Sequence, residues 1–557
     1  MAALDLYTGI LGKRLAAHLL RRSTYCFTRE RVLAFASKTP AQAMAELMAN
    51  PPLGLSQPID PLNGRVWINN APQPPPAVTT FDADRKQYVI GWWLNEALRD
   101  VSIRSRMSFF LHTNFVMSPT NVAFSEEFWD HLMLLRFYSL GNLKTLAKKI
   151  ITDNTMMRYL DLVDSLHPSP NLNFAREFLE LFTIGKGNQT GTGDYTNYTE
   201  DDILQTARVL AGWRIGERTP ANADPETGLT RGVPTPMYHG FAAKTFSYRF
   251  DNQQIVGVGA DDKAKMRDEL NKLVEMIYAK PETARFACRR LYRFFVRKDI
   301  STATEQDVIV PLAAFLVANN FNLGLTLTKL LTSKHFYDQD DAATNDEIVG
   351  AIIKSPLELF LQSMSYFKVA VPQPDPSNLA QCWNHYRLFW RTGVMYAFLQ
   401  YCGQMAFEPP SVAGYTPYYV APNYDFGWFN SATIIHRYNL SSMLMEGKKL
   451  NPDGSLHYDT LGGVQLDVVA YVDNKANISN PANADILVTE LLETLLPEMP
   501  DAPRYEYFRQ ALLAQLSPMN WQMEWTMYKS SGNATAVRIA LEKLIKTIMK
   551  SQEYQFF

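Results

Sequence analysis

The sequence predicts a mainly α-helical protein, with a large body of many helices and a small β or irregular insert. Apolar residues recur at the three- and four-residue spacing of amphipathic helices over most of the 557 residues. Helix start signals precede several of these stretches. Residues 214–262 differ, because Gly, Pro and Thr are frequent there and apolar residues alternate only in short pieces.

The chain is expected to begin with a helix pair over residues 1–50, the second helix being interrupted at Pro40. A proline-rich connector follows at 51–83. The main helical core is then expected over 84–338. Its predicted helices cover residues 84–113, 125–163, 198–213, 261–280, 281–296 and 326–338. Thr199 and Asp202 can satisfy the first free amides of the helix at 198–213 as an N-cap and its partner.

Within this core, the insert near 214–260 is expected to form a small β-ribbon from "KTFSYRF" and "QIVGVG". A C-terminal helical region is expected over 339–557. Its predicted helices cover residues 346–368, 378–402, 430–445, 484–495, 503–515 and 533–551. A tyrosine-rich loop at 409–428 and a polar insert at 447–482, with the strand-like piece "VQLDVVAYV", interrupt this region.

Composition narrows the class of protein. With 46% hydrophobic and 20% charged residues, the chain is typical of a folded globular protein. A net charge of −2 gives no reason to expect a nucleic-acid partner. No stretch of about eighteen apolar residues predicts a membrane span. The first residues lack the pattern of a secretory signal, which favours the cytoplasm, although export stays open if a leader has been removed.

Several long motifs occur in a fixed order along most of the chain. They are "LLRRSTYCFTRE", "MSFFLHTNFV", "NLNFAREFLELFTIGKGN", "YTEDDILQTARVLAGW", "YHGFAAKTF" and "PPSVAGYTPYYVAPNYDFGWFNSATIIHRYNL". This set resembles the bacterial Domain of Unknown Function family 1800, and the last motif resembles its Bacteroidota branch. The resemblance implies a mainly helical fold and no particular reaction. It also implies a protein partner, because members are often encoded beside a family related to sulfatases and alkaline phosphatases.

The chain departs from the family pattern at three polar positions. The first departure lies in the stretch that resembles the family's His-Asn-His motif. This chain keeps the first histidine, His112, but has Asn114 in place of the second. The second departure lies in "NLNFARE", which resembles a family motif of Asn-Glu-Asn followed by Ala-Arg-Glu. The acid between the two asparagines is replaced by Leu172. The aspartate that usually follows His239 is replaced by Gly240. If the family has a catalytic centre at these motifs, this chain has lost part of it.

One hypothesis for the remaining polar residues is a catalytic site made by His112, Glu177, Glu180 and His239. Histidine and carboxylate side chains can bind a metal or transfer protons, and Glu177 and Glu180 share a face if they lie on one helix. His112 and His239 are the candidate ligands of a divalent metal.

A structural network is the alternative for the same stretch, and we favour it. Arg176 and Glu180 lie one helical turn apart and can form an ion pair, and Arg208 on the next predicted helix is a second partner for the glutamates. Pairing protects such charges from the cost of burial.

Aromatic residues of the loop at 409–428 suggest a binding surface. Tyr415, Tyr418, Tyr419 and Trp428 can stack on sugars or anchor a protein partner. The alternative is that the loop folds back and seals the helical core.

Two functions are therefore predicted. The first, which we favour, is a non-catalytic assembly or binding protein with a degenerate polar centre. The second is a metal-assisted hydrolase or transferase acting on a glycan or a protein. The sequence leaves open whether the protein is an enzyme, and it does not predict the oligomeric state.

Overall fold

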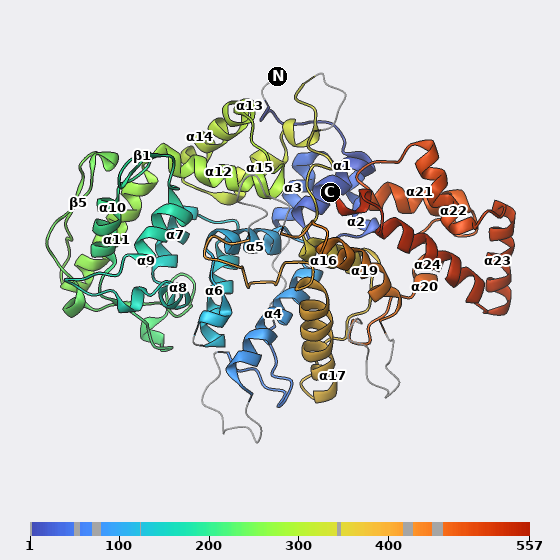
Figure 1. Cartoon of the computed structure of the whole chain (residues 1–557), viewed down its shortest axis with the longest axis horizontal. Helices are drawn as coiled ribbons and strands as arrows, with labels where there is room; N and C mark the ends of the chain where they lie inside the picture. Colours follow the sequence, from blue (N-terminus) through green and yellow to red (C-terminus); the bar gives the residue numbers. More distant parts are fainter. Residues whose placement is uncertain are drawn as a thin grey trace.

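A computed structural model describes residues 3–49, 56–68, 80–122, 124–341, 347–415, 427–447 and 461–557. Helices make up most of these ranges, and the strands that they contain form three small antiparallel pairs (Figure 1). The predicted mainly α-helical fold with a small β insert is confirmed. Across the described residues, no helix has the length and apolar character that crossing a lipid bilayer requires.

The N-terminal helices lie in the middle of the molecule (Figure 1). They are α1 (Gly12–Ser23), α2 (Arg29–Ala36) and α3 (Pro40–Ala49), so the predicted break at Pro40 separates two helices. Arg21 and Arg22 at the end of α1 are buried. Arg21 donates to the carbonyl oxygen of Leu496 at 2.9 Å, and Arg22 donates to that of Ile348 at 2.8 Å. The first helix is thereby bound to segments far along the chain.

Two long predicted helices are each divided in the structure. The predicted helix at 84–113 is α4 (Asp82–Arg99) and α5 (Arg104–Asn114), and the predicted helix at 125–163 is α6 (Ser125–Phe137), α7 (Leu143–Ile151) and α8 (Asn154–Tyr159). Asp100 accounts for the first break, because its carboxylate accepts bonds from the backbone amides of Ser102 and Ser105. Aspartate favours such turns over a helix interior for this reason.

The motif "NLNFAREFLELFTIGKGN" (171–188) is the signature stretch of this chain. It contains helix α9 (Asn173–Glu177), which continues as a π-helix, Phe178–Thr183 (η3). Helices α10 (Glu200–Leu210) and α11 (Asp262–Tyr278) contact the insert, and α12 (Pro281–Phe295) follows α11. The paired strands are β1 (Gln189–Gly191) with β2 (Asp194–Tyr195), β3 (Trp213–Arg214) with β4 (Val233–Pro234), and β5 (Lys244–Thr245) with β6 (Gln254–Ile255). The last pair is the predicted β-ribbon.

The N-terminus of α10 has the predicted cap. Thr199 Oγ1 accepts from the amide of Asp202 at 3.3 Å, and the Asp202 carboxylate accepts from the amide of Thr199 at 2.8 Å. We expect Thr199→Ala to lower the free energy of unfolding by about 1 kcal/mol, because one capping bond is lost. Urea titration followed by circular dichroism measures this change. Thr526→Ala, at an exposed position inside a helix, is the control and should stay within about 0.5 kcal/mol; equal losses in both variants would contradict the cap.

The remaining helices form the C-terminal half and one edge of the core. They are α13 (Thr302–Thr304), α14 (Val310–Ala318), α15 (Leu323–Leu331), α16 (Pro356–Tyr366), α17 (Leu379–Trp383), α19 (Thr433–Met445), α20 (Val468–Asp473), α21 (Ala484–Leu495), α22 (Ala502–Leu513), α23 (Pro518–Ser531) and α24 (Thr535–Met549). α17 continues as a long π-helix, Asn384–Leu399 (η9). The strand-like piece in 447–482 was wrongly predicted, because it forms helix α20, whose N-cap Asp467 accepts from the amide of Ala470.

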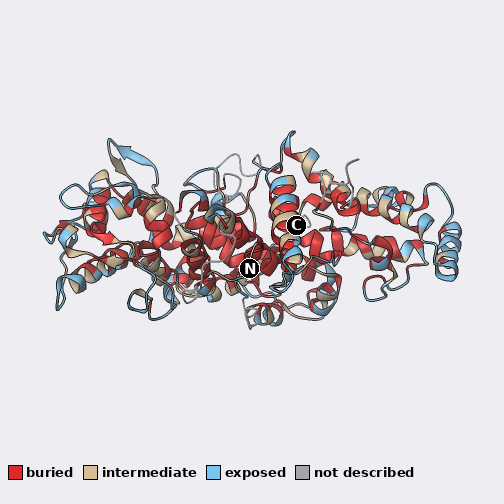
Figure 2. Cartoon of the chain, turned by 90° about the horizontal axis from the view of Figure 1, so that it is seen from below, coloured by how far each residue is buried: buried red, intermediate tan, exposed pale blue. Residues whose placement is uncertain are grey.

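Buried residues form one cluster that extends through the helical body, with exposed residues gathered at its periphery (Figure 2). α23, which the sequence did not predict, lies at the outer edge in Figure 1. Its two tryptophans, Trp521 and Trp525, are buried against the body while its methionines are exposed. Large apolar residues thus occur on both faces, which hides the usual amphipathic pattern.

Candidate functional site

A buried ion cluster joins the insert to helix α11. His239 follows the short 3-10 helix Pro236–Tyr238 (η5), Lys244 begins β5, and Glu269 lies in α11. Oε2 of Glu269 is 2.9 Å from Nε2 of His239 and 2.5 Å from Nζ of Lys244. Nδ1 of His239 is 2.7 Å from the carbonyl oxygen of Ala211. The side chains of His239, Lys244 and Glu269 have no exposed surface, so the cluster is internal.

The charges of this cluster stabilise one another. Burial raises the pKa of Glu269, but hydrogen bonds from His239 and Lys244 outweigh it, and the pKa stays below its ordinary value. Burial lowers the pKa of Lys244, and the bond to Glu269 offsets part of that shift. Both ring nitrogens of His239, predicted as a metal ligand, are in contact with protein oxygen atoms. They are therefore engaged in holding the insert against α11.

Gly240, which stands where the family pattern has an aspartate, lies against the ring of His167. A Cβ atom at this position would be 2.6 Å from Nδ1 of His167, closer than van der Waals contact permits. The carbonyl oxygen of Gly240 accepts from Nζ of Lys244 at 2.7 Å. An aspartate here would require His167 to move, which gives a steric reason for the glycine in this chain.

Arg176 pairs with Glu200 rather than with Glu180. The two terminal nitrogens of Arg176 are 2.8 and 2.7 Å from the two carboxylate oxygens of Glu200, a bidentate arrangement. Glu180 instead accepts from the hydroxyl of Tyr198 at 3.1 Å and lies 3.5 Å from Nζ of Lys186. The hydrogen-bonded pair expected one turn apart along the signature helix is therefore replaced by bonds to the following segment.

Glu177 is the last residue of α9, and the π-helix Phe178–Thr183 follows it directly. A π turn contains more residues than an α turn, so Glu177 and Glu180 no longer share one α-helical face. Burial, and then the negative charge of Glu180, raise the pKa of Glu177. Arg208 donates to Oε1 of Gln205 at 2.7 Å rather than to either glutamate. The residues predicted as one network thus have separate partners.

The other two positions of departure, Leu172 and Asn114, lie in different surroundings. Leu172 precedes α9 and is 37% exposed, so it lies at the surface. Asn114 is buried at the end of α5, where its Nδ2 donates to the carbonyl oxygen of Phe110 at 2.7 Å and its Oδ1 accepts from Arg290 at 2.8 Å. Both polar atoms of the Asn114 side chain therefore have hydrogen-bond partners within the protein.

His112 lies in a different part of the core, beside a histidine that the sequence analysis did not select. The rings of His112, from α5, and His131, from α6, have centroids 6.3 Å apart and meet at 80°. Nδ1 of His131 is 2.5 Å from a carboxylate oxygen of Asp153. Among the described residues, neither ring nitrogen of His112 has a hydrogen-bond partner. The same is true of Nε2 of His131. Burial, and then the nearby His131, lower the pKa of His112 well below its ordinary value.

Aromatic rings surround His112. The ring of Phe407 meets that of His112 at 62° with centroids 4.8 Å apart, Phe109 is at 6.1 Å, and Tyr415 is at 6.3 Å. Phe407 has a φ of 61°, a left-handed conformation that costs a non-glycine residue roughly 1–3 kcal/mol. The packing that pins this ring between His112 and Trp93 offsets that strain.

Two of the four aromatic residues predicted to bind a sugar or a partner are inside the protein. Tyr415 is buried, and its hydroxyl donates to the carbonyl oxygen of Met405 at 2.7 Å. Trp428 is also buried, and its carbonyl oxygen accepts from Arg437. Tyr418 and Tyr419 lie outside the described residues. The positions of Tyr415 and Trp428 agree with the alternative, in which the loop folds back and seals the core.

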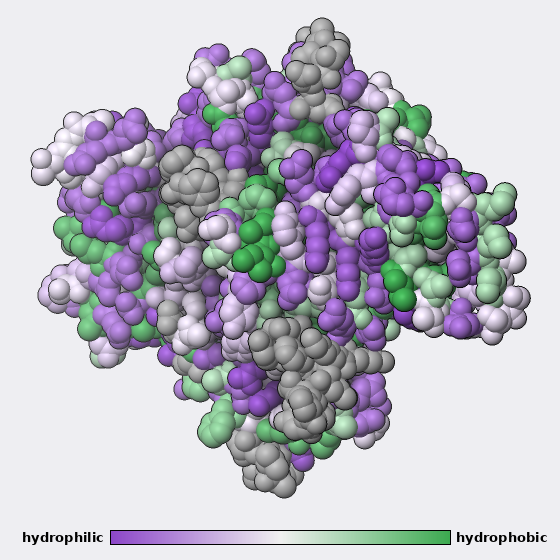
Figure 3. All heavy atoms as spheres, turned by 45° about the vertical axis from the view of Figure 1, so that its right-hand side comes forward, coloured by the Kyte–Doolittle hydropathy of each residue, from purple (hydrophilic) through white to green (hydrophobic). Residues whose placement is uncertain are grey.

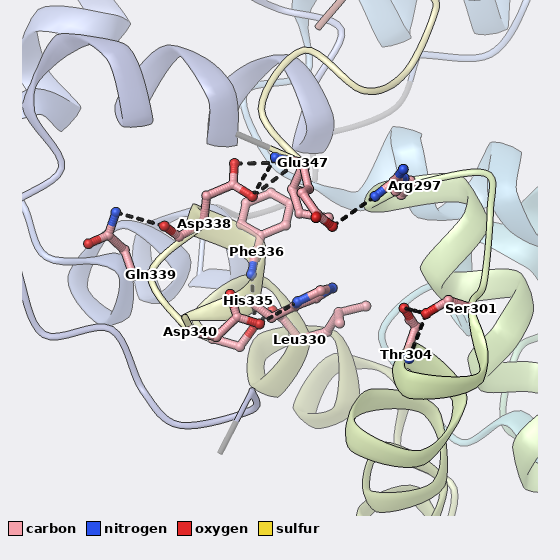
Figure 4. A network of polar contacts seen from close by, with 12 residues as sticks. Arg297, Ser301, Thr304, Leu330, His335, Phe336, Asp338, Gln339, Asp340 and Glu347 are labelled. Atoms are coloured by element: carbon pink, nitrogen blue, oxygen red, sulfur yellow. Dashed lines mark hydrogen bonds and ion pairs between the residues drawn. The ribbon is translucent and has the colours of Figure 1, made fainter. Parts of the chain in front are cut away.

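A cavity of about 660 Å³ opens beside His335 and is lined by carboxylates. Nδ1 of His335 is 2.7 Å from Oδ2 of Asp340, and the carboxylate of Asp338 accepts from the backbone amides of Glu347 and the two residues that follow it (Figure 4). Glu347 also pairs with Arg297 at 3.0 Å. These bonds hold the segment after α15 together and join it to the residues that follow α12, and they give Asp338, Asp340 and Glu347 a structural role.

A wider groove of about 1070 Å³ lies between α22 and α24. Lysines from α24, including Lys543 and Lys546, and acids such as Glu542 and Glu553 line it together. Arg504 pairs with Glu553 at 2.7 Å across it. Because both signs of charge are mixed, the groove has no strong preference for a charged ligand.

Side chains of the two predicted metal ligands do not meet. His112 contacts His131 and aromatic rings, whereas His239 contacts Glu269 and Lys244. In the described part of the chain, no group of three or more His, Cys, Asp or Glu side chains could hold a metal ion.

Comparisons with known proteins give a single result. Neither the curated proteins nor the solved structures contain a match to this chain. A family model described as "Protein of unknown function (DUF1800)" matches residues 18–556, which include the His112 and His239 environments and the signature stretch. The chain therefore belongs to the DUF1800 family.

Proposed function

We propose that this chain is a non-catalytic binding or assembly protein of a bacterial multi-protein system. It acts through a surface that binds a protein partner, and the polar centre of its family has degenerated. Support comes first from where the polar residues lie. His239 and Lys244 are engaged in the ion cluster with Glu269, and Glu180 bonds to Tyr198. These contacts link segments of the chain to one another, which is a structural role.

The alternative is a metal-assisted hydrolase or transferase that acts on a glycan or protein through His112, Glu177, Glu180 and His239. Such an enzyme needs these groups around one reacting bond. His112 contacts aromatic rings, Glu177 and Glu180 influence each other, and His239 contacts Glu269, which supports separate roles for these residues. We therefore favour the binding function.

Helix α23 carries the main evidence for a binding surface. Met519, Met523 and Met527 are four residues apart along it and form one stripe, and each is more than half exposed. Leu516, just before the helix, is also exposed. Figure 3, which brings this side forward, shows apolar side chains at the surface of the C-terminal part. Methionine stripes of this kind are typical of surfaces that adapt to a partner.

The charge of this face indicates what kind of partner it fits. Glu524 and Lys529 are the charged residues of α23, and Lys529 is bound to Asp473 at 2.8 Å. The cores of protein interfaces are depleted in charge and enriched in methionine. The partner therefore presents an apolar face, such as one side of an amphipathic helix, rather than an acidic or basic segment.

The test is co-purification with the tagged chain from its native host, comparing wild type with Met523→Glu. A partner should be recovered with wild type and lost by at least tenfold with Met523→Glu, because a buried unpaired charge costs several kcal/mol. Met237→Glu is the matched control, since Met237 is exposed on the short 3-10 helix η5 of the insert and should not affect recovery. Circular dichroism should show the same helix content in all three proteins.

Two outcomes would refute this surface. One is a partner that Met523→Glu recovers as well as wild type does. The other is a wild-type dimer, seen by light scattering, that Met523→Glu converts to a monomer, because the face then binds a second copy of this chain. If the recovered partner is related to sulfatases or phosphatases, the expectation drawn from the family resemblance is met as well.

A further inference from the structure

His112 differs from the other buried histidines in its hydrogen bonding. Nε2 of His18 contacts the carbonyl oxygen of Phe336, and Nδ1 of His385 contacts that of Pro372. Each of these rings donates its one N–H and leaves one lone pair, as a neutral imidazole can. His112 has no bond at either nitrogen among the described residues, although it is fully buried. A buried group of this kind points to a ligand that completes it.

The neighbouring ring is oriented as a metal ligand usually is. Asp153 accepts from Nδ1 of His131 at 2.5 Å, which fixes the tautomer and leaves the lone pair at Nε2. Histidines that bind metals commonly donate their other N–H to a carboxylate in this way. Nε2 of His131 has no partner in the described structure.

Phe407 can satisfy the N–H of His112. Its ring lies 4.8 Å from that of His112 at 62°, a geometry in which an N–H can point at an aromatic face. One lone pair then remains on His112 and one on His131. Two lone pairs on neighbouring rings can both donate to one cation, which an isolated ring such as that of His385 cannot offer.

We propose that His112 and His131 together bind one Cu(I) ion, with one nitrogen from each ring and Asp153 holding His131 in place. The ring separation fits this arrangement. Metal–nitrogen bonds are about 2.0 Å long, and a ring nitrogen lies roughly 1 Å from its ring centre, so two imidazoles on opposite sides of one ion have centroids roughly 6 Å apart. The observed distance is 6.3 Å.

Coordination number distinguishes Cu(I) from other metals that imidazole binds. Zn²⁺ takes four ligands in structural sites, but no third His, Cys, Asp or Glu in the described residues joins this pair. Phe109, Phe407 and Tyr415 surround His112 and exclude water ligands. Cu(I) is stable with two ligands, and its single charge is less costly to bury than that of a divalent ion. Aromatic faces also stabilise a cation.

The test is metal binding by the purified chain, kept reduced with ascorbate in the absence of oxygen. We titrate it with Cu(I) in competition with the chelator bicinchoninate. The wild type should bind one equivalent. His112→Asn and His131→Asn should each weaken binding by at least 100-fold, and Asp153→Asn should weaken it 10- to 100-fold, the range for residues that orient a ligand. His385→Asn, which alters an equally buried ring without a neighbouring histidine, should have no effect.

X-ray absorption of the loaded wild type gives a second measurement that needs no variant to fold. Two nitrogen scatterers and no sulfur are expected. Sulfur scattering would assign the copper to methionine or cysteine and overturn the site. Failure of the wild type to retain Cu(I), four-coordinate Zn²⁺ binding in its place, or unchanged affinity in folded His131→Asn would overturn it too. None of these results depends on recovery of a protein partner through α23.

Discussion

Glu269→Gln is expected to lower the free energy of unfolding by about 3–5 kcal/mol, since it removes the anion from a buried cluster and leaves Lys244 without its counter-charge. The carboxylate of Glu269 contacts both His239 and Lys244, and its other oxygen accepts from the amide of Gly257 at 3.1 Å. The glutamine amide keeps the shape of the side chain. The loss therefore reports the charge rather than the packing.

Urea titration followed by circular dichroism measures this loss. Glu275→Gln provides the matched control, because Glu275 lies on the same helix and its carboxylate also contacts two nitrogen-bearing side chains, those of Lys144 and Lys148, at 2.7 and 2.8 Å. Its side chain is 51% exposed, so solvent screens the pair and the expected loss is below about 1 kcal/mol. Similar losses in the two variants would show that the cluster around Glu269 is not sealed from water.

The same cluster predicts a pH dependence. The pKa of Glu269 is below its ordinary value in the folded protein, so its carboxylate stabilises the fold fully above the unfolded pKa of about 4.3. That contribution is lost as the pH falls from there through the lower, folded pKa. The free energy of unfolding should therefore decline more steeply below about pH 4.3 in wild type than in Glu269→Gln. Parallel declines would contradict this assignment.

Arg106→Met is expected to cost a similar amount, about 3–5 kcal/mol, because it leaves a carboxylate buried without its partner. Arg106 on α5 pairs with Glu358 on α16, and both side chains are 1% exposed. Nε of Arg106 also donates to the carbonyl oxygen of Arg22 at 3.2 Å. The guanidinium thus connects α1, α5 and α16, which are far apart in the sequence.

The matched control is Arg538→Met, since Arg538 pairs with Asp467 at 3.3 Å and the two side chains are 38% and 59% exposed. It should change the free energy of unfolding by less than about 1 kcal/mol. The double variant Arg106→Met with Glu358→Gln should recover part of the loss, as removal of both charges leaves neither one unpaired. If the losses of the two single changes simply add, the pair does not act as a unit.

Much of the fold could be predicted because helix formation leaves local signals. α21 covers the residues predicted for it, and Thr199 caps α10 as expected. Breaks within long helical patterns were missed, since they depend on single side chains such as Asp100 that bond to their own backbone. α23 was missed because large apolar residues occupy both of its faces.

Functional residues were harder to predict because their partners come from distant segments. His239 could be selected, but Glu269 could not, since it lies in an ordinary amphipathic helix 30 residues away from His239. His131 and Asp153 were missed for the same reason. The spacing of Arg176 and Glu180 predicted an ion pair, yet the helix changes to a π-helix between them and Arg176 reaches Glu200.

The central position of α1 has a consequence for biosynthesis. Arg21 donates to the carbonyl oxygen of Thr494, which lies 473 residues further along the chain. At 5–20 residues per second, the ribosome reaches that residue roughly half a minute to a minute and a half after α1 emerges. Until then, α1 can pack against its neighbour α2, but its contacts with α21 are missing. Native structure around the end of α1 should therefore be completed only late in synthesis or after release from the ribosome.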